Sequence, residues 1–147
     1  MALESFLDKE SQLRVVEAIE VAEKCTSGEI RVHIEPTCKK ENPYDRAVEV
    51  FDQLEMYKTE ARNGVLIYIA YKSRKLAVIG DKGITQKVGV NFWVGEKDIL
   101  AEYLRAKEPA EGLCKVIKMI GENLAKYFPY QKDDVNELSN EISYEEE

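Results

Sequence analysis

Histidine is almost absent from this sequence of 147 residues, which contains only His33. This scarcity nearly excludes a catalytic triad with a histidine base and a zinc site with several histidine ligands. The three cysteines, Cys25, Cys38 and Cys114, lie far apart and form no CxxC pair. Widely spaced thiols in odd number indicate reduced cysteines rather than a disulfide framework or a zinc centre. Any chemistry must use oxygen donors, lysines or arginines.

Positive charge and long apolar runs are also scarce. Acidic residues number 28 against 21 lysines and arginines, so the net charge is −7, which argues against nucleic acid or an anionic membrane as a partner. No apolar run approaches the ~20 residues of a membrane helix. The first residues, "MALESFLDKE", have neither the basic nor the apolar region of a secretory signal. We therefore expect a cytoplasmic protein without nucleic-acid or membrane partners, while the oligomeric state stays open.

The apolar pattern predicts alternating helices and strands in one domain. A strand, a helix and a second strand form a βαβ unit with parallel strands, and the short turn before the third strand makes that strand antiparallel. Helices complete the chain. This order predicts an α/β fold, a three-layer α/β/α sandwich of Rossmann-like appearance around a small mixed sheet. The predicted elements are helices at 5–25 and 43–57, strands at 29–35, 64–71 and 75–80, and helices starting at 81, near 95 and after 109.

Two details of this assignment concern polar residues. The strand at 29–35, "EIRVHIE", alternates apolar and polar side chains, which is typical of a half-buried strand, and His33 on its polar side is expected to be structural. A single domain is expected over residues 1–142. The segment 143–147, "SYEEE", is expected to be an acidic tail outside that domain.

The densest oxygen cluster follows the last predicted helix. It lacks the glycine and the spacing of an EF-hand loop, so that kind of calcium site is not expected. A solvated acidic segment and a segment that folds its acids back towards a cleft both stay open. The cluster consists of Asp133, Asp134, Asn136 and Glu137.

Chain connectivity brings three distant segments to one edge of the predicted sheet. The first two strands begin at this edge and the third ends there, so polar residues before or after each strand should gather. Glu29, Asn63 and Asp81 offer the hard oxygens that Mg²⁺ or Ca²⁺ prefers. Arg62 and Lys82 offer the positive charge that a phosphate group seeks. The pattern is compatible with a bound cation, a phosphoester, or both.

A simpler interpretation of the same residues is structural. Glu29 would pair with Arg62, and Asp81 would cap the helix that follows it. Gly80 and Gly83 would only permit the turn between strand and helix.

Four segments, in their order and spacing, resemble the TPM domain, also called TPM phosphatase. They are "SGEIRVHIE", "KTEARNGVLIYIA", "KLAVIGDKGI" and "NFWVGEKDIL". The resemblance spans residues 10–142. It implies an α/β/α sandwich, a divalent-cation site and, for some members, hydrolysis of phosphoesters or nucleotides.

The sequence departs from the family pattern in the placement of one acidic residue. Many exported members carry Asp-Asn-Gly before the central strand, whereas this chain has Arg62-Asn63-Gly64, and an acid appears instead at Asp81. Losing one carboxylate should weaken metal binding. Three functions therefore stay open. One is a domain that binds Ca²⁺ or Mg²⁺ and hydrolyses a small phosphoester or nucleotide, with Asp81 as ligand or nucleophile. The second is a non-catalytic cation-binding accessory or interaction domain, and the third is a purely structural role in envelope or stress maintenance.

Overall fold

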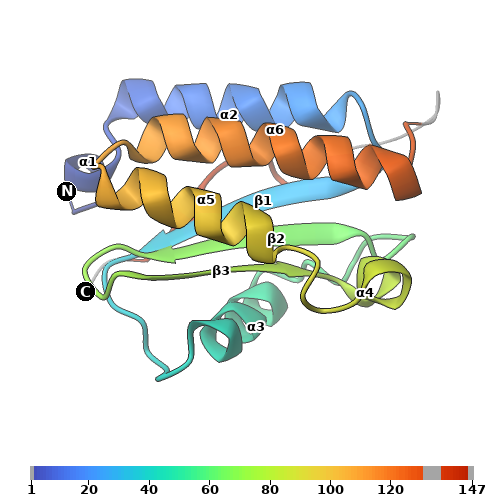
Figure 1. The fold of residues 1–147 in the computed structure, drawn as a ribbon, viewed down its shortest axis with the longest axis horizontal. Coiled ribbons are helices and arrows are strands. Elements are labelled where there is room, and N and C mark those ends of the chain that lie inside the picture. The colour runs from blue at the N-terminus through green and yellow to red at the C-terminus, as the bar shows by residue number, and fades with distance from the viewer. Residues whose placement is uncertain (1, 131–136, 146–147) are drawn as a thin grey trace.

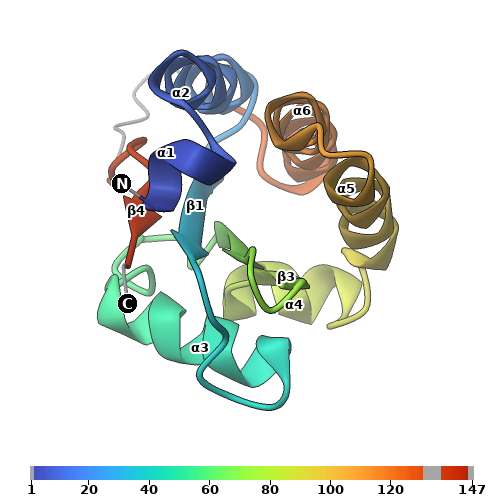
Figure 2. The same cartoon turned by 90° about the vertical axis from the view of Figure 1, so that its left-hand side faces the viewer.

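The computed structural model describes residues 2–130 and 137–145. A four-stranded sheet of order β3-β2-β1-β4 lies between two layers of helices, with α2, α5 and α6 on one face and α3 on the other (Figures 1 and 2). The predicted α/β/α sandwich is confirmed. The elements are α1 (Ala2–Phe6), α2 (Lys9–Glu23), β1 (Glu29–Glu35), α3 (Pro43–Gln53), β2 (Gly64–Ala70), β3 (Lys75–Gly80), α4 (Lys82–Val88), α5 (Val94–Arg105), α6 (Pro109–Tyr127) and β4 (Ser143–Tyr144).

The strand pairing has the predicted βαβ unit and hairpin. β1 and β2 are parallel, with Glu29 opposite Gly64 at one end and Glu35 opposite Ala70 at the other. β2 and β3 are antiparallel, and Gly80 lies opposite Val65. Every residue of β2 is buried, as the continuous apolar run "VLIYIA" predicts for a central strand covered on both faces.

Two apolar cores lie on the two faces of the sheet, because successive side chains of a strand point to opposite faces. The larger core lies beneath α2, α5 and α6 and includes Ile30, Val32 and Ile34 of β1. The smaller core lies against α3 and includes Leu66 and Tyr68 of β2. Among the described residues, no helix combines the length and the apolar character needed to cross a membrane.

β1 is buried on both faces, so the prediction of a half-buried strand was wrong. Glu29 and His33 are each only 3% exposed, and Glu35 is 1% exposed. Arg46 of α3 and the C-terminal segment hold the polar side of the strand. Arg46 donates to Glu35, and the backbone N–H of Leu138 donates to Glu29. Alternation of residue type identified the strand correctly but could not show that remote segments of the chain bury its polar side.

A fourth strand lies in the segment that was expected to be an acidic tail. Ser143 and Tyr144 form β4, which pairs in parallel with His33 and Ile34 of β1. The backbone N–H of Glu145 donates to the carbonyl of Ile34 at 3.1 Å. The expectation that 143–147 lies outside the domain was therefore wrong for residues 143–145. The high acid content concealed a segment whose backbone completes the edge of β1.

The first predicted helix is divided into α1 and α2. Asp8 accepts a hydrogen bond from the backbone N–H of Ser11 at 2.8 Å and so begins α2. Leu3 and Leu7 are buried and fix the short α1 against the core. The break follows from this packing, which helical spacing alone does not reveal.

Candidate functional site

The three predicted segments meet at the edge of the sheet where β1 and β2 begin. Glu29 pairs with Gly64 across the parallel ladder, and its N–H donates to the carbonyl of Asn63 at 3.3 Å. On the other side of β2, the N–H of Asp81 donates to the carbonyl of Gly64 at 2.9 Å. Glu29 and Asp81 are thus two strand spacings apart, about 10 Å between their Cα atoms. We call this edge, with Glu29, Arg62, Asn63 and Asp81, the rim.

Asp81 and Arg62 form a bidentate ion pair at the rim. Arg62 donates from Nε to Oδ2 of Asp81 at 2.7 Å and from Nη2 to Oδ1 at 3.0 Å. Oδ1 of Asp81 also accepts from the N–H of Lys82 at 2.7 Å, which confirms that Asp81 caps α4. Lys82 itself extends its side chain from an exposed position. Arg62 therefore pairs with Asp81, not with Glu29 as the structural interpretation supposed.

Gly83 is required by the close approach of α4 to the turn before β2. Its N–H donates to the carbonyl of Arg62 at 2.9 Å. A Cβ atom at Gly83 would lie 2.2 Å from the carbonyl oxygen of Ala61 and 2.6 Å from that of Arg62. Both contacts are with backbone, so a side chain could not be accommodated by a rotamer change.

Replacing Gly83 with alanine should therefore lower the free energy of unfolding by about 1–3 kcal/mol through overpacking. Urea unfolding measures this change. The matched control is Gly95→Ala, also in a helix, because a Cβ atom there meets nothing within 4 Å. Alanine at Gly95 should be neutral or stabilising by up to about 1 kcal/mol. Equal midpoints for the two variants would contradict the close approach at Gly83.

Glu29 has one satisfied oxygen and one without a donor. Oε1 accepts from the N–H of Leu138 at 2.6 Å. Oε2 of Glu29 is buried and has no hydrogen-bond partner among the described residues. The same is true of Oδ1 of Asn63. Burial first, and the neighbouring carboxyl group of Glu137 second, outweigh the hydrogen bond from Leu138 and raise the pKa of Glu29 to about 7. A buried carboxylate beside a second one requires a proton or a cation.

The oxygen donors at the rim match the ligands that Ca²⁺ and Mg²⁺ prefer. Glu29 and Asn63 were identified from the sequence by strand topology. Glu137 was only part of the acidic cluster, yet its Oε2 accepts from the N–H of Glu60 at 3.2 Å, so it has folded back towards the rim. The rest of that cluster lies outside the described residues: Asp133, Asp134 and Asn136.

A shallow cleft of about 260 Å³ opens between α3 and β3 beside the ion pair. Arg62 and Asp81 lie at one end of the cleft, and Asp52 lies on α3. Two partly exposed tyrosines, Tyr44 and Tyr57, complete its walls. The volume suits a small group such as a phosphoryl or a single ring. The cleft is therefore where a small molecule could reach Asp81.

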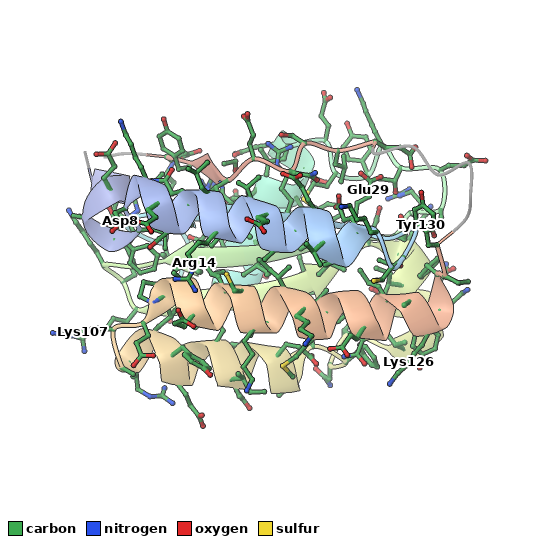
Figure 3. The ribbon with its side chains drawn as sticks, turned by 90° about the horizontal axis from the view of Figure 1, so that it is seen from above. Asp8, Arg14, Glu29, Lys107, Lys126 and Tyr130 are labelled. Atoms are coloured by element: carbon green, nitrogen blue, oxygen red, sulfur yellow. The ribbon has the colours of Figure 1, made fainter. Side chains whose placement is uncertain are left out.

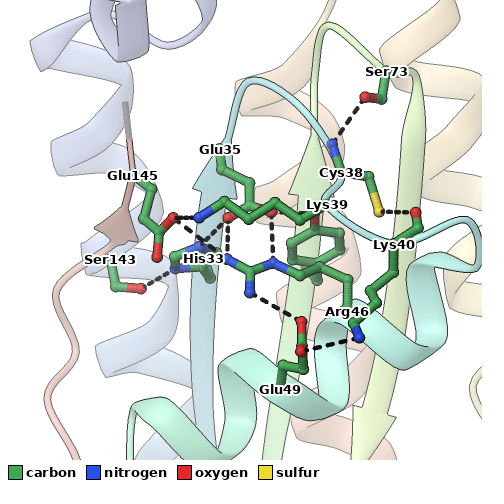
Figure 4. A network of polar contacts seen from close by, with 11 residues as sticks. His33, Glu35, Cys38, Lys39, Lys40, Arg46, Glu49, Ser73, Ser143 and Glu145 are labelled. Carbon is green, nitrogen blue, oxygen red and sulfur yellow. Dashed lines mark hydrogen bonds and ion pairs between the residues drawn. The ribbon is translucent and has the colours of Figure 1, made fainter. Parts of the chain in front are cut away.

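A second polar cluster lies at the opposite end of β1 (Figure 4). Glu35 accepts hydrogen bonds from Nε and Nη2 of Arg46, both at 2.9 Å, and from the hydroxyl of Tyr68. Nε2 of His33 lies 3.1 Å from the same carboxylate. Burial alone would raise the pKa of Glu35, but these hydrogen bonds outweigh it and lower the pKa to about 2. Glu35 is therefore ionised and fully partnered.

This cluster also fastens β4 to the sheet. Nδ1 of His33 lies 2.5 Å from Oγ of Ser143. Glu145 forms ion pairs with Lys39 and, at 3.4 Å, with Arg46. His33, Glu35 and Glu145 could offer ligand atoms to a metal, but the guanidinium of Arg46 already supplies their positive charge. Burial lowers the pKa of His33, so the ring is held neutral and structural.

Comparison with known proteins finds one matching family and two similar solved structures, each covering most of this chain. The sequence matches the TPM domain profile, a TPM phosphatase family, over residues 2–123. The NMR structure of BA42 from the psychrophilic bacterium Bizionia argentinensis is 43% identical, with a TM-score of 0.87 over 95% of this chain and 96% of that chain. The N-terminal domain of cg2496 from Corynebacterium glutamicum is 10% identical, with a TM-score of 0.63 over 87% and 79%, a likeness of fold alone. No curated protein matches this sequence significantly.

Proposed function

The chain belongs to the TPM domain family, and on this premise we propose that it binds a divalent cation, Ca²⁺ or Mg²⁺, at the rim. Glu29 and Asn63 would be ligands, together with the neighbouring Glu137. The observation that carries this proposal is the pair of buried oxygens, Oε2 of Glu29 and Oδ1 of Asn63, without a donor in the described part of the chain. Leaving such oxygens unpartnered costs free energy that a cation would recover.

Asp81 enters the ligand set under one condition. Both of its oxygens are held by Arg62, so Asp81 becomes available only when that guanidinium turns to another anion. A small phosphoester or nucleotide in the cleft would supply one, with Arg62 binding the phosphate. Lys82 does not line the cleft, but it follows Asp81 at an exposed position and would add positive charge nearby. Asp81 would then be free as a metal ligand or as a catalytic group. This exchange is the form of the phosphohydrolase proposal that the geometry supports.

The bidentate pair also favours a second candidate, a cation-binding domain without turnover. Arg62 stands where many family members carry an acid, and its charge neutralises Asp81 internally. A closed ion pair of this kind needs neither a metal nor a phosphate to complete it. In this case cation binding through Glu29 and Asn63 would stabilise the domain for an accessory or interaction role.

Asp81→Ala separates the two candidates. The protein is incubated with ATP, ADP and a chromogenic phosphoester in Mg²⁺, Ca²⁺ or EDTA, and phosphate release and thermal stability are measured. For the phosphohydrolase we expect metal-dependent release that Asp81→Ala abolishes, while stability falls by about 2–3 kcal/mol for the lost helix cap and the lost bidentate pair with Arg62. Asp52→Ala, which removes an exposed acid from the same cleft, should retain release.

The remaining outcomes are equally informative. Thermal stabilisation by metal without phosphate release would support the non-catalytic domain. Neither stabilisation nor release would overturn both candidates. Global unfolding of Asp81→Ala would show that the residue acts mainly as a structural cap.

A further inference from the structure

A larger cavity lies at the end of the sheet opposite the rim. Its volume is about 540 Å³, about twice that of the cleft. Five elements contribute to its lining: α1, the end of β2, the start of β3, the C-terminal part of α5 and the first residue of α6. Seven residues of β2 separate it from the rim, about 20 Å along the strand. Figure 3 shows Lys107, which lines the cavity, at the opposite end of the molecule from Glu29. We call this cavity the distal pocket.

The apolar part of the lining of the distal pocket, which we call its floor, includes two aromatic rings. The rings of Phe6 and Tyr71 stack with centroids 4.9 Å apart and an angle of 10° between their planes. Leu76, Ala101 and Leu104 extend this surface along β3 and α5. Such a floor suits an aromatic ring or a short acyl chain, since both gain by leaving water.

The edge of the distal pocket is strongly basic, although the chain as a whole carries a charge of −7. Arg74, Lys75, Arg105 and Lys107 line it, and the described lining residues include no aspartate or glutamate. In the part of the chain that the structure describes, none of the four forms an ion pair with an acidic side chain. Lys75 instead donates to the backbone carbonyl of Glu41 at 2.7 Å.

Local helix chemistry accounts for only part of this charge. Arg105 lies in the last turn of α5, where a cation complements the helix dipole. Arg74 and Lys75 belong to the β2–β3 hairpin and gain nothing from that dipole. The acidic residues nearest in sequence to Arg105 and Lys107 are Glu102 and Glu108. They line a different surface, together with Lys115. Cations from two unrelated segments thus converge on one apolar floor.

We propose that the distal pocket binds a small organic anion, with a ring or chain on the Phe6–Tyr71 floor and a carboxylate or phosphate at the basic edge. Each part of such a ligand meets its complement, since the apolar part is desolvated while the anion stays near solvent beside flexible cations. This proposal is independent of the cation site at the rim. It also differs from the cleft, where the only lining cation, among described residues, is already paired with Asp81.

The test is an NMR titration of the ¹⁵N-labelled full chain with 2-naphthoate, its neutral analogue 2-naphthamide, and inorganic phosphate. The amides of Tyr71, Leu76 and Leu104 report on the distal pocket. We expect saturable chemical-shift changes there with naphthoate. The other two probes should bind with an affinity at least about fivefold lower. The double variant Arg105→Gln, Lys107→Gln should weaken naphthoate binding about fivefold, since each exposed charge pair contributes modestly.

The matched control is Lys115→Gln, Lys118→Gln, which removes the same charge from exposed positions of α6 and should bind naphthoate as the unaltered chain does. Ala101→Met, which fills the floor and keeps all four cations, should abolish the shifts. Three results would overturn the proposal: no saturable shifts with naphthoate, equal affinity for the neutral amide, or equal losses in the test and control double variants.

Discussion

Glu29→Gln should raise the free energy of unfolding at about pH 8 without metal by about 2 kcal/mol, and should also abolish stabilisation by Ca²⁺. The folded carboxyl group keeps its proton up to about pH 7, whereas the ordinary value is 4.5. Because the folded state binds the proton more tightly, the unaltered chain loses stability as pH rises from 4.5 to 7. Glutamine carries no charge and keeps an acceptor for the N–H of Leu138. Urea unfolding across this range, with EDTA or Ca²⁺, measures both effects.

Glu23→Gln is the matched control for this experiment. Burial also raises the pKa of Glu23 to about 7, and its Oε2 accepts from the N–H of Ile30 at 2.8 Å. Its replacement should likewise stabilise the metal-free protein at high pH but leave most of the Ca²⁺ response. A full Ca²⁺ response in Glu29→Gln would contradict the role of Glu29 as a ligand. Lower stability of that variant at high pH would contradict its buried ionisation.

Metal binding should itself depend on pH in the same range. A cation binds the ionised carboxylate, so below about pH 7 it must displace the proton of Glu29. Affinity for Ca²⁺ should therefore rise up to about tenfold per pH unit below 7 and level off above it. Isothermal titration calorimetry in two buffers of different ionisation enthalpy would detect the released proton. A pH-independent affinity would show that Glu29 takes no part.

Arg46→Met should lower the free energy of unfolding by about 3–5 kcal/mol, more than any other substitution proposed for this chain. The change leaves Glu35 ionised and buried without its main partner, and it removes one of the contacts that hold Glu145. Urea unfolding measures the loss. Hydrogen exchange at the amide of Glu145, which donates to Ile34, should accelerate if β4 separates from β1.

Two variants test whether burial causes this loss. Arg14→Met removes the exposed Arg14–Glu111 pair, whose side chains are 47% and 56% exposed, and should cost less than about 1 kcal/mol. Adding Glu35→Gln to Arg46→Met removes the uncompensated charge and should recover part of the stability. If Arg46→Met and Arg14→Met cost the same, the cluster contributes no more than a surface ion pair.

Most of the fold could be predicted because local signals agree with its topology. The apolar run of β2, the short turn at Lys72 and Ser73, and the Asn42-Pro43 start of α3 are each sufficient to identify an element. The convergence of Glu29, Asn63 and Asp81 at the rim then follows from connectivity alone. The cap at Asp81 was equally predictable, because an aspartate directly before a helix commonly accepts a hydrogen bond from a free backbone N–H of the first turn.

The partners of the polar residues could not be predicted. Arg62 can reach either Glu29 or Asp81 by topology, and only packing selects Asp81. β4 was missed because a two-residue strand carries no periodic signal, and its pairing with His33 joins positions 110 apart. Glu137 could not be placed because the segment before it gives no apolar pattern. In each case the deciding interaction is between segments remote in sequence.

The position of β4 has a consequence for biosynthesis. β1 is among the first elements made, yet the strand that completes it is made after all the other described helices and strands. Until Ser143 emerges, the backbone of β1 near His33 stays without its neighbour, and the nascent chain presents an open hydrogen-bonding edge. Docking of β4 must close a very long loop, so it is expected to be a late step of maturation. During that interval the chain would be most exposed to chaperones and to pairing with other copies.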